Sequence, residues 1–180
     1  MRLSAVLPVC VAVSLPFSSA IFADEAYQTD YHHALLGLPQ EHATFFHRPQ
    51  AASRASLLYT LSTKAILGAV NPKDGSLVWR QQLASTSRPA SSFLRTGEGE
   101  GVVISAIGQE VRAWDALNGK LLWDNEFRGG TATDLEIVET VEGEAGRKDA
   151  IVLFSHNGEG TIRRLSGESG DVVWEFHDNR

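Results

Sequence analysis

The sequence predicts an all-β fold, a partial β-propeller of about three four-stranded blades. Three observations support this class: a repeated Gly-x-x-x-Trp motif, a repeat length in the forties, and short apolar runs separated by tight turns, with no amphipathic helical pattern. The motif residues, which we regard as structural, are Gly75, Trp79, Gly119, Trp123, Gly170 and Trp174.

The spacing of the motif matches one propeller blade per repeat. Gly75 and Gly119 are 44 residues apart, and Gly119 and Gly170 are 51 apart. The seven extra residues fall at 142–148, a polar stretch without periodicity that we expect to be a surface loop between strands. A repeat in the forties is typical of a four-stranded blade.

Each repeat is predicted to run strand, tight turn, strand, glycine turn, Trp strand. The strands preceding the glycines are expected at 56–61 and 65–70, 102–107 and 111–113, and 150–155 and 161–165. The tight turns between them are expected at Thr63-Lys64, Gly108-Gln109 and Asn157-Gly158. Asn-Gly is the strongest of these signals, because both residues tolerate the positive φ that a two-residue hairpin needs.

The glycine and the tryptophan of the motif have separate tasks. A turn-favouring residue stands before each glycine, which adopts a left-handed φ without a Cβ clash. Alternation places Trp79 on the same face as Leu83, and Trp123 on the same face as Phe127. We expect this face to pack against the next blade. Trp114 lies outside the repeat phase, so we expect its loss to cost less stability than the loss of Trp123.

The N-terminus predicts a cleavable signal peptide over residues 1–20. Arg2 gives a positive start, a mainly apolar run follows, and Ser18-Ser19-Ala20 supplies the small residues before the cleavage point, with a second possible site after Ala23. The run is too short for a permanent anchor and contains two prolines. Cys10 is removed with it, so no disulfide can hold the mature chain. We expect an N-terminal arm with a possible first strand over 21–55, and blades over 56–180.

Composition and motifs indicate no catalytic, cofactor-binding or metal-binding residue. The net charge of −6 argues against nucleic acid as a partner. Four histidines near the N-terminus lack metal-site spacing, and we expect them on a solvated arm: His32, His33, His42 and His47. The glycine-rich run at 97–101 precedes a strand and not a helix, which is wrong for a phosphate loop.

Two segments carry a family resemblance. The stretches 69–79 and 113–123 resemble the blade motif of quinoprotein-type propellers, whereas the third copy departs from it at Arg164 and Ser166. A more specific resemblance comes from the order of three features along the chain. These are a signal peptide, the stretch Asp30-Tyr31-His32-His33, and residues 65–71 leading into Gly75 and Trp79. This order resembles the N-terminal end of subunit 1 of the endoplasmic reticulum membrane protein complex, in its fungal form.

The resemblance implies a non-enzymatic scaffold without a cofactor. It implies a longer, single-pass membrane protein, with propellers on the luminal side of the endoplasmic reticulum and a spanning helix beyond this segment. Its partners would be other subunits of a complex that inserts tail-anchored and multipass membrane proteins. Two alternatives remain open: a quinone-dependent dehydrogenase-like propeller and a bacterial outer-membrane assembly propeller. Because three blades cannot close a ring, we also expect the propeller to continue beyond residue 180.

Overall fold

The computed structural model of the chain describes residues 36–49, 55–83, 91–97, 101–138 and 146–178. These residues form twelve strands in three four-stranded sheets, and none of them is in a helix. All neighbouring strands pair antiparallel. The predicted fold class is therefore confirmed. The signal peptide expected at 1–20, the arm through residue 35 and most of the inserted loop lie outside the described residues.

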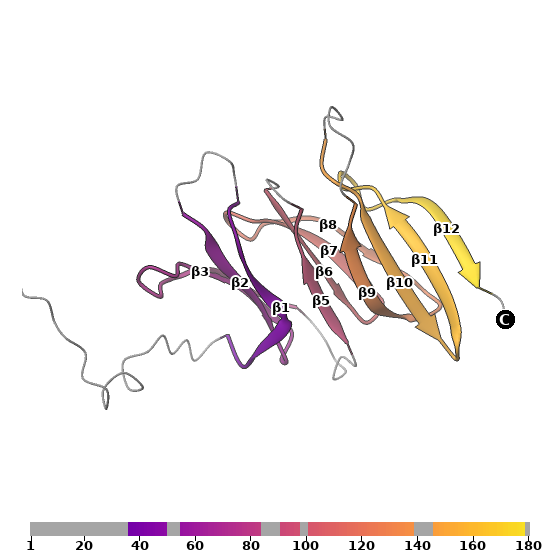
Figure 1. Cartoon of the computed structure of the whole chain (residues 1–180), viewed down its shortest axis with the longest axis horizontal. Helices are drawn as coiled ribbons and strands as arrows, with labels where there is room; N and C mark the ends of the chain where they lie inside the picture. Colours follow the sequence, from indigo (N-terminus) through magenta and orange to yellow (C-terminus); the bar gives the residue numbers. More distant parts are fainter. Residues whose placement is uncertain (1–35, 50–54, 84–90, 98–100, 139–145, 179–180) are drawn as a thin grey trace, which may run out of the picture. The chain divides into compact units, whose positions relative to one another are not determined.

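Each sheet is one blade whose strands pair in the order of the chain (Figure 1). Blade 1 contains β1 (Pro39–His47), β2 (Leu57–Ser62), β3 (Ile66–Val70) and β4 (Leu77–Gln82). Blade 2 contains β5 (Ser92–Arg95), β6 (Val102–Ile107), β7 (Glu110–Asp115) and β8 (Leu121–Glu126). Blade 3 contains β9 (Thr131–Ile137), β10 (Ala150–His156), β11 (Glu159–Leu165) and β12 (Val172–Asp178).

Tight turns join the middle strands of each blade where the sequence predicts them. Asn157 and Gly158 connect β10 to β11 with φ values of 52° and 88°. Gly108 has a φ of 60° in the turn between β6 and β7. Positive φ at these positions fits a two-residue hairpin, whose twist then matches the twist of the paired strands.

The first strand of each blade is the element that sequence patterning locates least well. β1 falls within residues 21–55, β5 has four residues, and β9 alternates only partly between buried and exposed positions. These three strands lie next to one another, with β5 beside both β1 and β9. Strand length and alternation are the two signals on which strand prediction depends; length is weak in β5 and alternation is weak in β9.

The core lies between blades in two clusters. The first joins blades 1 and 2, and the second joins blades 2 and 3. Consecutive residues of β6 contribute to different clusters, since Val103 packs in the first and Ile104 in the second. All six residues of β6 are buried as a result. The middle blade is thus covered on both faces.

Candidate interaction site: the contact between blades

The three motif turns have the same hydrogen-bonded geometry. In each, the glycine N–H donates to the carbonyl of the residue four positions earlier, at 2.8 Å: Gly75 to Asn71, Gly119 to Asp115, and Gly170 to Ser166. The three glycines have φ values of 69°, 70° and 75°. A residue with a Cβ would be strained at such a φ, which explains the glycine in every copy.

Blade 1 is bound to blade 2 through Trp79. Its Nε1–H donates to the carbonyl oxygen of Ala116 at 2.9 Å, and its ring lies on Gly119. A Cβ added to Gly119 would lie 2.5 Å from Trp79 Cδ2, closer than any side-chain contact allows. Two residues further along β4, Gln81 Nε2 donates to the carbonyl oxygen of Gly119 at 2.9 Å. The glycine therefore serves both its own turn and the ring of the preceding blade.

A second donor reinforces the same contact. The hydroxyl of Tyr59, on β2, donates to the Ala116 carbonyl oxygen at 2.8 Å. Tyr59 is fully buried, and this burial raises the pKa of its phenol, with a smaller contribution from the carboxylate of Asp115. The phenol thus remains protonated at neutral pH, as a hydrogen-bond donor must be.

Blade 2 is bound to blade 3 by the same geometry. Trp123 Nε1–H donates to the carbonyl oxygen of Gly167 at 3.1 Å, and a Cβ on Gly170 would lie 2.5 Å from Trp123 Cε3. In both contacts the accepting carbonyl belongs to the residue three positions before the turn glycine. Both interfaces therefore share one geometry. The tryptophan ring packs on the turn glycine of the next blade, and the indole N–H donates to the carbonyl oxygen three residues before that glycine.

The third tryptophan is placed differently. Trp79 and Trp123 are each 7% exposed, whereas Trp174 on β12 is 42% exposed. Within the described part of the chain, the Trp174 indole has no hydrogen-bond acceptor. Trp174 therefore presents a ring and a donor with no following blade among the described residues.

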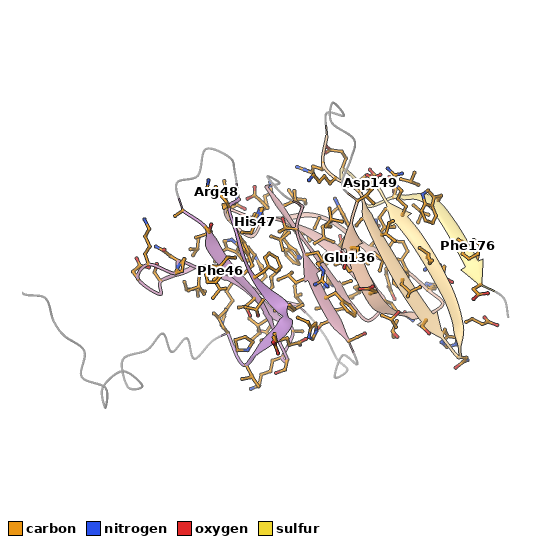
Figure 2. All side chains as sticks on the ribbon, in the orientation of Figure 1. Phe46, His47, Arg48, Glu136, Asp149 and Phe176 are labelled. Carbon is orange, nitrogen blue, oxygen red and sulfur yellow. The ribbon has the colours of Figure 1, made fainter. Side chains whose placement is uncertain are left out.

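One departure of the third motif, Arg164, has a structural cause. Arg164, where the other copies have alanine, donates from Nε to Asp149 Oδ2 at 2.7 Å, and Asp149 Oδ1 accepts the N–H of Gly167 at 2.9 Å. Asp149 stands just before β10, at the end of the inserted stretch (Figure 2). A Cβ on Gly167 would lie 2.3 Å from the Lys148 carbonyl oxygen. The end of the insertion is therefore packed on the motif turn, an anchor that the sequence did not predict.

Two residues are more buried than the sequence suggests. His47, expected on a solvated arm, is buried at the end of β1 with its ring 6.0 Å from that of Tyr59. Trp114 is 6% exposed and donates from Nε1 to Ser105 Oγ at 2.9 Å, so the smaller loss expected for it has no structural basis. The expectation for His47 was therefore wrong, and the burial of Trp114 argues against a smaller loss there. His42 is exposed, as expected, and its Nε2–H donates a hydrogen bond to the Ser92 carbonyl oxygen at 2.9 Å.

The described residues contain no group of three or more His, Cys, Asp or Glu side chains arranged to hold a metal ion. Their charged side chains pair across strands instead. Arg95, on β5, donates to the His42 carbonyl oxygen at 3.0 Å, and its Nε lies 3.7 Å from the carboxylate of Glu136 (Figure 2). Arg95 therefore connects β1 to β9. These contacts join blade 2 to blades 1 and 3.

The stacked sheets and their Trp-Gly contacts define part of a β-propeller. Among solved structures, a europium-containing methanol dehydrogenase is 16% identical with a TM-score of 0.55, over 71% of this chain and 24% of that one. The computationally designed Ika4 protein is 14% identical with a TM-score of 0.54, over 81% of this chain and 79% of that one. At such identities the likeness shows the fold alone.

Residues 20–180 match the family described as the EMC1 N-terminal beta-propeller domain, and the chain belongs to that family. The ER membrane protein complex subunit 1 of Gallus gallus is 22% identical over 166 residues. That alignment covers 92% of this chain and 16% of the chicken protein, so the chain spans about a sixth of its relative. A search of the described residues finds no helix able to cross a membrane.

Proposed function

We propose that this chain is a luminal propeller segment of a scaffold subunit of the endoplasmic reticulum membrane protein complex, which supports the insertion of tail-anchored and multipass membrane proteins. The family match over residues 20–180 is the observation that carries the proposal. The signal-peptide pattern at residues 1–20 supports entry into the secretory pathway. The luminal side of the membrane is where a translocated domain would then fold.

The contacts described above suit a scaffold. Blades are joined by buried rings and by hydrogen bonds to main-chain carbonyls, which fix each sheet against the next. A fixed stack of sheets holds its surface loops at set positions, and loops positioned by a rigid framework are a common means of binding partner proteins. Rigidity is therefore the property that this segment would contribute to a multi-subunit assembly.

The proposal includes the absence of catalysis. The motif residues are used in turns and blade contacts, and the likeness to a methanol dehydrogenase is a likeness of fold, which does not transfer activity. The direct check is to add pyrroloquinoline quinone and Ca²⁺ to the purified full-length protein with alcohols and an electron-accepting dye. We expect no dye reduction above that of the protein without quinone. Quinone-dependent reduction would contradict a purely structural role.

Membership of the complex is tested by retrieving the tagged full-length protein from detergent-solubilised membranes and identifying what accompanies it by mass spectrometry. We expect other subunits of the complex. Trp123→Ala, which removes a blade contact, should reduce their recovery, whereas Lys73→Ala, on an exposed turn, should not. Recovery of the protein alone, at normal abundance, would argue against the proposal.

The compartment and the activity need separate tests. In sealed microsomes, the segment should resist added protease until detergent opens the membrane, and its mature N-terminus should be Ile21. Depletion of the protein should lower the insertion of a tail-anchored reporter, and re-expression should restore it. Normal insertion after complete depletion would limit the proposal to membership of the complex.

A further inference from the structure

The face of blade 1 turned away from blade 2 has a notch at Gly68, on β3. Alternation along β3 directs Leu67 and Ala69 into the core cluster between blades 1 and 2, so Gly68 faces the opposite side. The register aligns Gly68 with Arg112 of blade 2 and Arg163 of blade 3, because each stands one residue before the strand partner of the motif tryptophan. Blade 1 therefore lacks the long side chain that the other two blades have at this position.

Leu36, which precedes β1, fills this notch. It is 6% exposed, and a Cβ added to Gly68 would lie 2.4 Å from Leu36 Cδ2 and 3.7 Å from Leu36 Cγ. In blade 3 the equivalent position is filled from its own strand, since the guanidinium of Arg163 lies over the rings of Phe127 and Phe154. Blade 1 covers the same position with a residue from the segment that leads into the sheet.

The two residues after Leu36 return the chain to β1. Gly37 has a φ of 80°, which favours glycine, and a Cβ there would lie 3.2 Å from Ser62 Oγ. The carbonyl oxygen of Leu38 accepts the N–H of Thr63, in the turn between β2 and β3, at 3.1 Å, while Leu38 itself is 71% exposed. A buried leucine, a glycine with a left-handed φ and a main-chain hydrogen bond therefore hold residues 36–38, which we call the latch.

The strand that follows the latch is irregular where it begins. A register shift separates the Pro39–Ser62 pair of β1 and β2 from the regular pairs, which start at Thr44. Within that interval β1 is held to β5 instead, because the Ser92 hydroxyl donates to Gln40 Oε1 at 2.7 Å. The latch is therefore joined to the regular ladder through a break, and it can move while the ladder stays paired.

We propose that the latch is a conformational device with two states: it closes over blade 1 with Leu36 in the Gly68 notch, and it opens while the sheets stay folded. Opening uncovers Leu36 and the notch together, so an apolar side chain and the socket that fits it become accessible in the open state alone. Local opening of this kind occurs in segments that are held by few buried contacts. The proposal rests on the contacts of blade 1 and is independent of the proposed role in a membrane complex.

Amide hydrogen exchange of the full-length protein, read by mass spectrometry at single-residue resolution, measures the opening, because the Thr63 amide is bonded to the latch. Leu36→Ala should speed exchange at Thr63 by about 10- to 100-fold, the factor that corresponds to the lost burial of a leucine side chain. Leu38→Ala is the matched control, since it removes an exposed side chain and keeps the carbonyl that accepts the bond. Equal exchange at Thr63 in these two variants would overturn the proposal.

Exchange along β6, in the middle blade, shows whether the latch opens by itself. These amides belong to a strand covered on both faces, so their exchange should be the same in Leu36→Ala as in the unmodified protein. Faster exchange along β6 would mean that the sheets unfold with the latch, which would overturn local opening.

A second variant tests the notch itself. Gly68→Val fills the notch from β3, so it should displace Leu36 and speed exchange at Thr63. In the double variant Leu36→Ala/Gly68→Val, exchange should be no faster than in the faster of the single variants, because both substitutions act through one contact. Increases that multiply would show that Leu36 and Gly68 act separately and would overturn the proposal.

Discussion

Tyr59 and Trp79, on different strands of blade 1, donate to a single acceptor, the carbonyl oxygen of Ala116 in blade 2, at 2.8 and 2.9 Å. Their rings are 6.0 Å apart, so one blade reaches the next through a pair of adjacent aromatic donors. The contact between blades 2 and 3 has one such donor, because Ile104 takes the place of Tyr59 in the strand register. The two interfaces therefore share a geometry and differ in their number of hydrogen bonds.

Tyr59→Phe should lower the free energy of unfolding by about 1 kcal/mol, since the ring remains and the Ala116 carbonyl keeps its bond from Trp79. The pKa of Tyr59 is raised in the folded state, so its contribution is complete below the ordinary tyrosine pKa of 10.0 and is lost as the pH rises above it. Urea unfolding from pH 8 to pH 11 should therefore show a flatter alkaline decline for the variant. An unchanged slope would contradict this origin of the pH dependence.

Gly119→Ala should be destabilising by about 2–4 kcal/mol, because it adds strain at a φ of 70° to a clash with the Trp79 ring. Gly108→Ala is the matched control. Its φ is 60°, and an added Cβ would meet nothing within 4 Å, so only the backbone strain of about 1–2 kcal/mol should appear. Urea unfolding measures both. Equal losses would mean that the ring contact does not contribute.

Trp123→Phe should cost about 1–3 kcal/mol in urea unfolding, because the Gly167 carbonyl loses its indole donor in a buried setting. Trp174→Phe, measured in the chain of residues 21–180, should change stability by less than about 0.5 kcal/mol, as expected for an exposed position. A large loss for Trp174→Phe would show that its ring is already covered.

Trp114→Ala should lower the free energy of unfolding by about 3–5 kcal/mol, as Trp123→Ala should, because both rings are buried.

Asp149→Ala should release the end of the insertion from the third motif turn. It removes the acceptor for Arg164 Nε and for the Gly167 N–H, a loss of about 1.5–3 kcal/mol for bonds to a charged group. Trypsin should then cut faster after Arg147 and Lys148 under native conditions. Asp124→Ala, on the exposed side of β8, should leave the cutting rate unchanged. Equal rates in both variants would contradict an anchoring role for Asp149.

Glu175→Gln should flatten the loss of stability in acid. The hydrogen bond from Arg163, and then its charge, lowers the pKa of Glu175 below the ordinary 4.5. Stability from this pair is therefore present above pH 4.5 and is lost as the pH falls toward the lowered value. The variant should also be less stable at neutral pH, because buried Arg163 loses its charged partner. Unfolding midpoints between pH 6 and pH 3 would test both effects, and parallel curves for the two proteins would contradict them.

The repeat was readable from the sequence because its signals are local. Turn glycines such as Gly119 require a particular φ, and hairpin residues such as Asn157 require another, whatever surrounds them. The family followed from the order of those signals. The burial of side chains between the sheets, by contrast, could not be predicted from local signals. Trp114 and His47 are buried by residues distant in sequence, and Asp149 anchors a turn that lies beyond two further strands. Such contacts depend on which sheets meet, which alternation along one strand does not reveal.

The acceptors of both indole hydrogen bonds are main-chain carbonyl oxygens, one on an alanine and the other on a glycine. Every residue carries such an atom, so mutation of Ala116 leaves the bond possible as long as the backbone keeps its path. Gly167 is more restricted, because a Cβ there would meet the Lys148 carbonyl. The side-chain requirements of each contact therefore fall mainly on the tryptophan and the turn glycine. Homologous chains could in this way diverge to the 22% identity seen with the chicken relative and still stack their blades alike.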